Sequence, residues 1–235
     1  MIKAAHSSES PPDPIWVLIP AYNEEGRIGD VVTHARPYAD RVVVVDDSSC
    51  DGTSAAAAAA GATVLRHEVN RGKGAALRTG LAYIRQQGGG IIVCLDADGQ
   101  HDPAEIPKFV AAHRRTGLPV LIGNRMADPT GMPWIRRCTN RFMSALLSRE
   151  MNQYVPDTQC GYRLFGRDVL PLLDGRDDRF AADSETLLRL AGRGVRIGSV
   201  RIHTIYRDEL SKIRPVRDAL RFFRMWRDWR RGRRG

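Results

Sequence analysis

The sequence predicts an α/β fold in which helices cover both faces of a mostly parallel β-sheet. Short apolar runs rich in β-branched residues alternate with segments long enough to form crossover helices. Acidic residues follow three of these apolar runs, and the carboxyl ends of parallel strands lie along one edge of a sheet, where open α/β sheets bind ligands. The 235 residues, 43% of them hydrophobic, suffice for one large domain or two small ones.

Strands and helices are expected to alternate from residue 15 onwards. Pro20 should end the first strand because it cannot donate a ladder hydrogen bond, and Pro103 is typical of the first turn of a helix. Thr53 or Ser54 should cap the alanine-rich helix after the second strand. The expected strands are 15–20, 41–45, 62–65, 91–95, 119–123, 161–165 and 195–202, and the expected helices are 24–35, 55–60, 70–84, 103–115, 134–150 and one beginning at 182.

The two ends of the chain are predicted to lie outside this domain, which should span residues 15–212. Residues 1–14 have the composition of a flexible lead-in and lack the apolar segment of a secretory signal. Residues 213–235 contain nine arginines and two aspartates, and so carry +7 of the net charge of +9. Their apolar stripe beside arginines predicts a basic amphipathic helix on an anionic membrane surface. Nucleic-acid binding is less favoured because no recognised module accompanies the charge.

No apolar run approaches the ~20 residues of a membrane-spanning helix, so no transmembrane helix is predicted. The four cysteines lie far apart in the sequence. This spacing argues against a zinc site and favours a reduced, cytosolic setting.

Asp96 and Asp98 follow the buried run 91–95 and are the first candidates for a metal site. Carboxylate oxygens two residues apart can hold a hard divalent cation, which in turn neutralises a diphosphate. The alternative is a polar strand end that forms an Asx turn. Because Glu24 and the pair Asp46/Asp47 also follow strands, three acidic groups should meet at one edge. This convergence predicts a nucleotide–metal site.

The segment Gly72-Lys73-Gly74 opens the third helix. It lacks the spacing and the Ser or Thr of a Walker phosphate loop, which excludes that type of site. Two interpretations stay open: a loop that packs against the nucleotide pocket, and an ordinary helix start.

Four motifs, in this order and spacing, resemble those of the family-2 glycosyltransferases, and the last is similar to the branch of dolichyl-phosphate mannose and glucose synthases. The resemblance covers residues 15–212. It implies a GT-A fold, a nucleotide-sugar donor linked through UDP or GDP, and inversion at the anomeric carbon. The motifs are Pro20-Ala21-Tyr22-Asn23-Glu24, Asp46-Asp47-x-Ser49-x-Asp51-Gly52-Thr53, Asp96-Ala97-Asp98-Gly99-Gln100-His101 and Asp157-Thr158-Gln159-Cys160-Gly161-Tyr162-Arg163-Leu164-Phe165.

The resemblance also implies roles on the donor side. Asp98 and Gln100, with Asp96, resemble ligands of Mg²⁺ or Mn²⁺, and Arg125 is similar to an arginine that faces the phosphates. Lys212, and with a less regular match Arg207, resemble residues of a segment that closes over the diphosphate. The residues similar to a base, ribose and sugar pocket are Pro20, Tyr22, Glu24, Val45, Asp47, Asp96 and Ala97.

On the acceptor side, the resemblance implies a polyprenyl or dolichyl phosphate and cationic contacts from the helix 134–150. Arg136 and Arg141 are the candidates there, and Gln159 and Glu185 are further acceptor-side residues. A lipid phosphate is already anionic at neutral pH and needs no strong base. A saccharide or other hydroxyl acceptor needs one, and Asp157 is then the best candidate. A metal-dependent nucleotidyltransferase is a second alternative, and a scaffold that has lost its activity is a third.

Ile135, Cys138, Phe142 and Leu146 recur at helical spacing in 134–150. This stripe packs either on the sheet or against a membrane. Together with the basic tail it predicts a cytoplasmic protein associated peripherally with the cytoplasmic face of a membrane.

Overall fold

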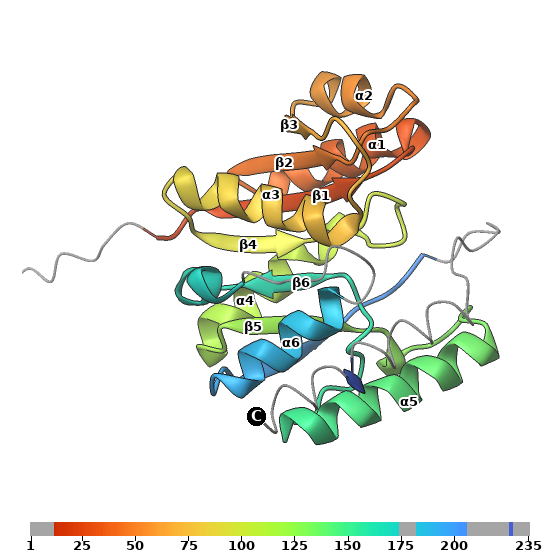
Figure 1. Ribbon diagram of the computed structural model, residues 1–235, viewed down its shortest axis with the longest axis vertical. Helices are drawn as coiled ribbons and strands as arrows, with labels where there is room; N and C mark the ends of the chain where they lie inside the picture. Colours follow the sequence, from red (N-terminus) through yellow and green to blue (C-terminus); the bar gives the residue numbers. More distant parts are fainter. Residues whose placement is uncertain (1–11, 174–181, 206–225, 228–235) are drawn as a thin grey trace, which may run out of the picture.

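The computed structural model describes residues 12–173, 182–205 and 226–227. Its centre is a seven-stranded sheet in the order β3-β2-β1-β4-β6-β5-β7 (Figure 1). β6 runs antiparallel to its neighbours β4 and β5, and all other pairs are parallel. The strands are β1 (Ile15–Ala21), β2 (Arg41–Asp46), β3 (Thr63–Arg66), β4 (Ile91–Cys94), β5 (Val120–Asn124), β6 (Arg163–Phe165) and β7 (Ile197–Arg201).

Helices flank the sheet on both faces. In Figure 1, α3 and α6 lie in front of the sheet and α4 lies behind it, while α5 runs along the bottom of the view beneath α6. The helices are α1 (Glu25–Ala35), α2 (Thr53–Ala59), α3 (Lys73–Gln86), α4 (Ile106–Thr116), α5 (Trp134–Met151) and α6 (Ala182–Gly192). Short 3₁₀ turns are η1 (Arg36–Tyr38), η2 (Pro103–Glu105), η3 (Arg125–Ala127) and η4 (Arg167–Leu172).

The central strands are buried on both faces, which explains their continuous apolar sequences. Residues 42–45 are four consecutive valines, and all four are buried. α3 lies directly on β1 at Gly80, where an added Cβ would come within 2.2 Å of the Leu18 side chain. The close approach of helix and strand therefore requires glycine at this position.

The predicted fold class is confirmed, and all seven expected strands are present. Two local predictions were wrong. β1 continues through Pro20 to Ala21, because β4 pairs with β1 only as far as Leu18 and Pro20 needs no donor on that side. α2 begins at Thr53 without a side-chain cap, because the Thr53 hydroxyl instead accepts the N–H of Glu24.

Within the described part of the chain, no helix is both long and apolar enough to cross a bilayer. Most of the predicted lead-in and of the basic helix 213–235 falls outside the described residues, as do Arg207 and Lys212. The predicted domain limits therefore stay predictions.

Candidate active site

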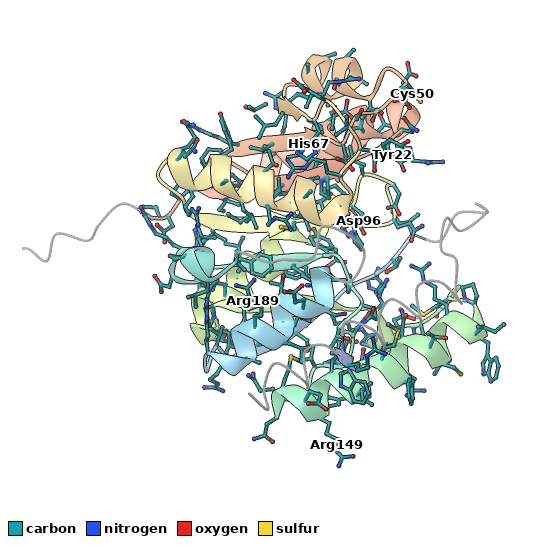
Figure 2. All side chains as sticks on the ribbon, in the orientation of Figure 1. Tyr22, Cys50, His67, Asp96, Arg149 and Arg189 are labelled. Carbon is teal, nitrogen blue, oxygen red and sulfur yellow. The ribbon has the colours of Figure 1, made fainter. Side chains whose placement is uncertain are left out.

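The three predicted acidic groups lie at one edge of the sheet. β2, β1 and β4 are adjacent and parallel, so the segments after Asp46, Ala21 and Cys94 leave the sheet on the same side. Figure 2 shows Tyr22, His67 and Asp96 on this edge. The convergence that the sequence predicts is thus present in the fold.

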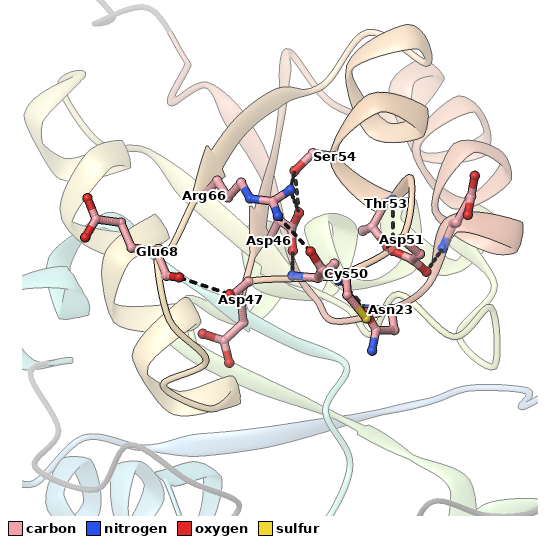
Figure 3. Close-up of polar contacts among 12 residues, drawn as sticks. Asn23, Asp46, Asp47, Cys50, Asp51, Thr53, Ser54, Arg66 and Glu68 are labelled. Atoms are coloured by element: carbon pink, nitrogen blue, oxygen red, sulfur yellow. Dashed lines mark hydrogen bonds and ion pairs between the residues drawn. The ribbon is translucent and has the colours of Figure 1, made fainter.

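Asp46 organises the loop after β2 (Figure 3). Its carboxylate accepts the N–H of Ser49 at 2.8 Å, an Arg66 guanidinium N–H at 3.1 Å and the hydroxyl of Ser54. Arg66 also donates to the Ser49 carbonyl at 2.7 Å. Asp46 is fully buried, and its oxygens are occupied by the loop, so its role is structural.

The loops after β1 and β2 are joined by backbone-to-side-chain hydrogen bonds. The Cys50 N–H donates to Asn23 Oδ1 at 2.9 Å (Figure 3). The Asn23 N–H donates to Ser49 Oγ at 2.9 Å, and the Glu24 N–H donates to Thr53 Oγ1 at 2.8 Å. Asn23 has a positive φ of 53°. These contacts fix the flanking residues, so that Glu24 is nearly buried while the Tyr22 ring stays 47% exposed. An exposed, fixed aromatic ring can stack on a nucleobase.

Asp47 anchors the start of α3 to the end of β2. Its carboxylate accepts the N–H groups of Arg71 at 2.9 Å and Gly72 at 2.6 Å, and lies 2.7 Å from His67 Nδ1. His67 Nε2 lies 2.9 Å from the hydroxyl of Thr79, nearly two turns into α3. The start of α3, for which the sequence left two interpretations open, is therefore held against the edge of the sheet where the acidic groups meet.

Asp96 is bound through both its backbone and its side chain. Its N–H donates to His101 Nδ1 at 3.1 Å, and its carboxylate lies 2.6 Å from Lys73 Nζ. Although burial opposes ionisation, the Lys73 ammonium and the neighbouring charges hold the pKa of Asp96 well below its usual range. Burial lowers the pKa of His101 to about 4. His101 is therefore neutral at pH 7, which suits its role as an acceptor at Nδ1.

Asp98 differs from Asp96 in its surroundings. Burial, followed by the charge of Asp96, raises its pKa, and its Oδ1 accepts the N–H of Gln100 at 3.0 Å. Carboxylate oxygens suit a hard divalent cation, which would offset the repulsion between Asp98 and Asp96. Among the described residues, no three His, Cys, Asp or Glu side chains form a complete metal site. A cation held here would need further oxygens, such as those of a diphosphate.

Arg125 and Asp157 form a buried ion pair at the end of β5. Arg125 Nε lies 2.7 Å from one carboxylate oxygen and Nη2 lies 2.9 Å from the other, and the Arg125 backbone N–H also donates to this carboxylate at 3.2 Å. Both residues are buried. This bidentate geometry fixes the plane of the guanidinium group. That Arg125 faces phosphates and that Asp157 acts as a base stay predictions.

The acceptor-side candidates are only partly brought together. Gln159 Nε2 donates to Ser184 Oγ at 3.4 Å, which brings Gln159 close to Glu185, the next residue of α6. The neighbouring Thr158 N–H donates to Ser144 Oγ at 2.9 Å and so joins this turn to α5. Arg136 is half-buried and Arg141 is exposed. They lie about 140° apart around α5 because successive residues turn by about 100°, so the two arginines point to different sides of the helix.

Comparison with known proteins identifies the family. The model of glycosyl transferase family 2 matches residues 16–172. The chain belongs to this family. This glycosyltransferase is 34% identical over 215 residues to UDP-N-acetylglucosamine–dolichyl-phosphate N-acetylglucosaminyltransferase of Methanococcus voltae, covering 82% of this chain and 86% of the relative. It is 30% identical over 171 residues to polyprenol monophosphomannose synthase of Mycolicibacterium smegmatis, covering 67% and 63% of the two chains.

A solved structure shows the same fold. Glucosyl-3-phosphoglycerate synthase from Mycobacterium tuberculosis, in complex with Mn²⁺, UDP-glucose and phosphoglyceric acid, matches this glycosyltransferase with a TM-score of 0.69 at 22% identity. The match covers 91% of this chain and 78% of the synthase. The GT-A-like fold predicted from the motifs is thus confirmed.

Four polar residues of this glycosyltransferase site were not predicted. Lys73 pairs with Asp96, His67 contacts Asp47, and His101 binds the backbone of Asp96. Arg163 is fully buried and donates to the carbonyls of Cys160 at 2.9 Å and Thr158 at 2.9 Å, which shapes the turn after Asp157. Lys73 stood out in the sequence beside two glycines, but its partner could not be inferred.

Proposed function

We propose that this protein is an inverting glycosyltransferase that moves a sugar from a UDP- or GDP-linked donor to a polyprenyl- or dolichyl-type lipid phosphate. The reaction takes place at the cytoplasmic face of a membrane and depends on Mg²⁺ or Mn²⁺. The names of the two relatives support a lipid phosphate as the acceptor. The solved structure with the same fold contains Mn²⁺ and UDP-glucose, which supports the proposal of a metal ion and a nucleotide-sugar donor.

The Arg125–Asp157 ion pair is the observation that carries this proposal. Both carboxylate oxygens of Asp157 are occupied by Arg125, and the side chain is buried. A base must reach the proton that it removes, and a carboxylate enclosed in this way is poorly placed to do so. An acceptor phosphate carries its negative charge before it binds and needs no base. The pair therefore favours a phosphate over a hydroxyl acceptor.

The other site residues have roles consistent with this reaction. Tyr22 stacks on the base, Asp47 and Glu24 line the base and ribose pocket with Pro20 and Val45, and Arg125 faces the diphosphate. Asp98 and Gln100 would hold the divalent cation, which would supply positive charge to offset the charge that develops on the leaving nucleoside diphosphate. The acceptor phosphate oxygen attacks the anomeric carbon on the side opposite the diphosphate as the bond to the diphosphate oxygen breaks, which inverts the configuration.

Donor and acceptor can be identified with purified protein. A short polyprenyl phosphate is incubated separately with UDP-glucose, UDP-N-acetylglucosamine and GDP-mannose. We expect one of these donors to release its nucleoside diphosphate, and we expect a chelator to abolish this release. Phosphoglyceric acid replaces the lipid in the matched control, and should raise turnover little above that without acceptor. Turnover with phosphoglyceric acid but not with the lipid would contradict a lipid acceptor. No turnover with any donor would contradict the assignment as an active transferase.

The exposed side of α5 supports contact with a membrane. Trp134 is 75% exposed, Ile135 is 66% exposed, and Phe142 and Cys138 are also exposed, so three of the four predicted apolar residues do not pack on the sheet. Their positions fall within about 100° around the helix. Arg141 and Arg149 lie on the same exposed side, and Arg149 projects outward in Figure 2. Large apolar side chains beside arginines suit the interface of an anionic bilayer.

Replacing Trp134 and Ile135 together with serine should weaken binding to vesicles that contain phosphatidylserine. Each side chain loses about 1.5–3 kcal/mol of apolar burial if it inserts, so partitioning should fall at least roughly tenfold. Cosedimentation measures this. The matched control replaces Tyr38 of η1 and Val69 in the loop between β3 and α3, two exposed apolar residues away from α5, and should not change binding. Unchanged binding of the Trp134/Ile135 variant would exclude α5 as the membrane contact.

A further inference from the structure

Lys73 connects two segments at the edge of the sheet that carries the acidic groups. It is the first residue of α3, directly after Gly72, whose N–H is held by Asp47 at 2.6 Å. Its ammonium reaches across to Asp96 after β4, with 2.6 Å between Nζ and Oδ1. The position of the Lys73 ammonium is therefore set by Asp47 at the end of β2, and this ammonium pairs with the carboxylate of Asp96, two residues after β4.

Gly161 covers the Lys73–Asp96 pair from a third direction. A Cβ at this position would lie 2.7 Å from Asp96 Oδ2 and 2.9 Å from Lys73 Nζ. Both distances are shorter than a van der Waals contact, so a side chain here would displace the ion pair. The turn after Asp157 thus accommodates this pair only with a glycine at position 161.

The two carboxylates of the Asp-x-Asp motif consequently have different partners. Asp96 is joined to an ammonium group and, through its backbone, to His101. Asp98 accepts only a backbone N–H, that of Gln100, among the hydrogen bonds of the described residues. A carboxylate already paired with a cation is a weaker ligand for a second cation, because part of its charge is neutralised.

We propose that Lys73 is a positioning residue that occupies Asp96 and thereby assigns the divalent cation to Asp98. Asp96 is then kept in one orientation for the donor, and the ammonium adds a positive charge near the diphosphate. The second part rests on the proposed function. The first part concerns only the protein and the metal ion, so it can be tested without any donor.

Lys73→Met should shift metal and donor binding in opposite directions. Loss of the Lys73 ammonium leaves the negative charge of Asp96 unpaired near the metal site. In the absence of nucleotide, Mn²⁺ should therefore bind this variant roughly tenfold more tightly than the wild type. The KM for the donor should rise about 10- to 100-fold, because an attractive charge-assisted contact is lost and an anion is freed. The EPR signal of free Mn²⁺, titrated into the purified protein, measures the first quantity.

Three further variants separate this role from simple damage. Lys73→Arg keeps the charge and should restore Mn²⁺ affinity to within about threefold of the wild type. Lys108→Met removes a lysine of α4 that pairs with Glu105 of η2 at 2.6 Å and should change neither quantity. Gly161→Ala should disturb the pair sterically and raise the donor KM. Thermal unfolding shows whether each variant is folded, since misfolding would weaken both metal and donor binding.

Equal or weaker Mn²⁺ binding by Lys73→Met, including no binding by either protein, would overturn the assignment of Lys73. This result would leave the transferase proposal intact if the wild type turns over a donor. Tighter Mn²⁺ binding without turnover of any donor would support the role of Lys73 toward the metal and contradict the proposed reaction. The two proposals can therefore fail separately.

Discussion

Replacement of Asp98 with alanine is expected to lower kcat on the order of 10³-fold or more, because the proposed ligand of the cation beside the leaving diphosphate is lost. Burial of the Asp98 carboxylate, followed by repulsion from the charge of Asp96, raises its pKa. Alanine removes this repulsion, so the free energy of unfolding should not decrease substantially. Initial rates at saturating donor and a range of Mn²⁺ concentrations measure the effect.

The matched control is Asp102→Ala, four residues further along the same loop. The Asp102 carboxylate accepts the N–H of Ala104 at 2.9 Å and caps η2. Its loss should cost about 1 kcal/mol of stability and leave metal-dependent turnover in place. Chelator-sensitive turnover of Asp98→Ala within tenfold of the wild type would contradict the role of Asp98 in metal binding.

Asp157→Asn is expected to have the second largest effect, on both stability and turnover. It leaves the Arg125 guanidinium buried without its carboxylate partner, which should cost about 3–5 kcal/mol of stability. The loosened guanidinium would also lose its fixed plane toward the diphosphate, so kcat should fall by about 10²-fold or more. Denaturant unfolding and initial rates measure the two effects.

The double variant Arg125→Met/Asp157→Leu tests the same ion pair from the opposite direction. Apolar residues can replace a buried ion pair without loss of stability, so stability should recover while activity does not. A general base predicts a different pattern for Asp157→Asn: the acidic limb of the pH–rate profile would disappear and stability would change little. That pattern would favour a hydroxyl acceptor.

The strands and the position of the site were predictable because both follow from local sequence. Runs such as the valines 42–45 fit only a strand buried on both faces, and parallel strands bring their carboxyl ends together. Glu24, Asp47 and Asp98 could therefore be assigned to one edge without coordinates. The limits of the helices were predicted to within a few residues wherever proline or glycine marks an end.

The contacts that give each residue its role were not predictable from local sequence. Arg125 and Asp157 are 32 positions apart and were assigned separate tasks, whereas the fold joins them. Lys73 and Asp96 meet only because α3 crosses over β1 towards β4. For α5, the periodicity identified an apolar stripe, but only packing shows that Trp134 and Ile135 face outward.

The most direct test of the central proposal is the mass spectrum of the lipid fraction after reaction with the active donor. Transfer to a lipid phosphate predicts a product that has the mass of polyprenyl phosphate plus one glycosyl residue and contains one phosphorus atom. NMR of this product should show that the anomeric configuration is inverted relative to the donor. A lipid carrying two phosphorus atoms would mean that sugar phosphate is transferred. An unmodified lipid, with the sugar on another molecule, would equally contradict glycosyl transfer to a lipid phosphate.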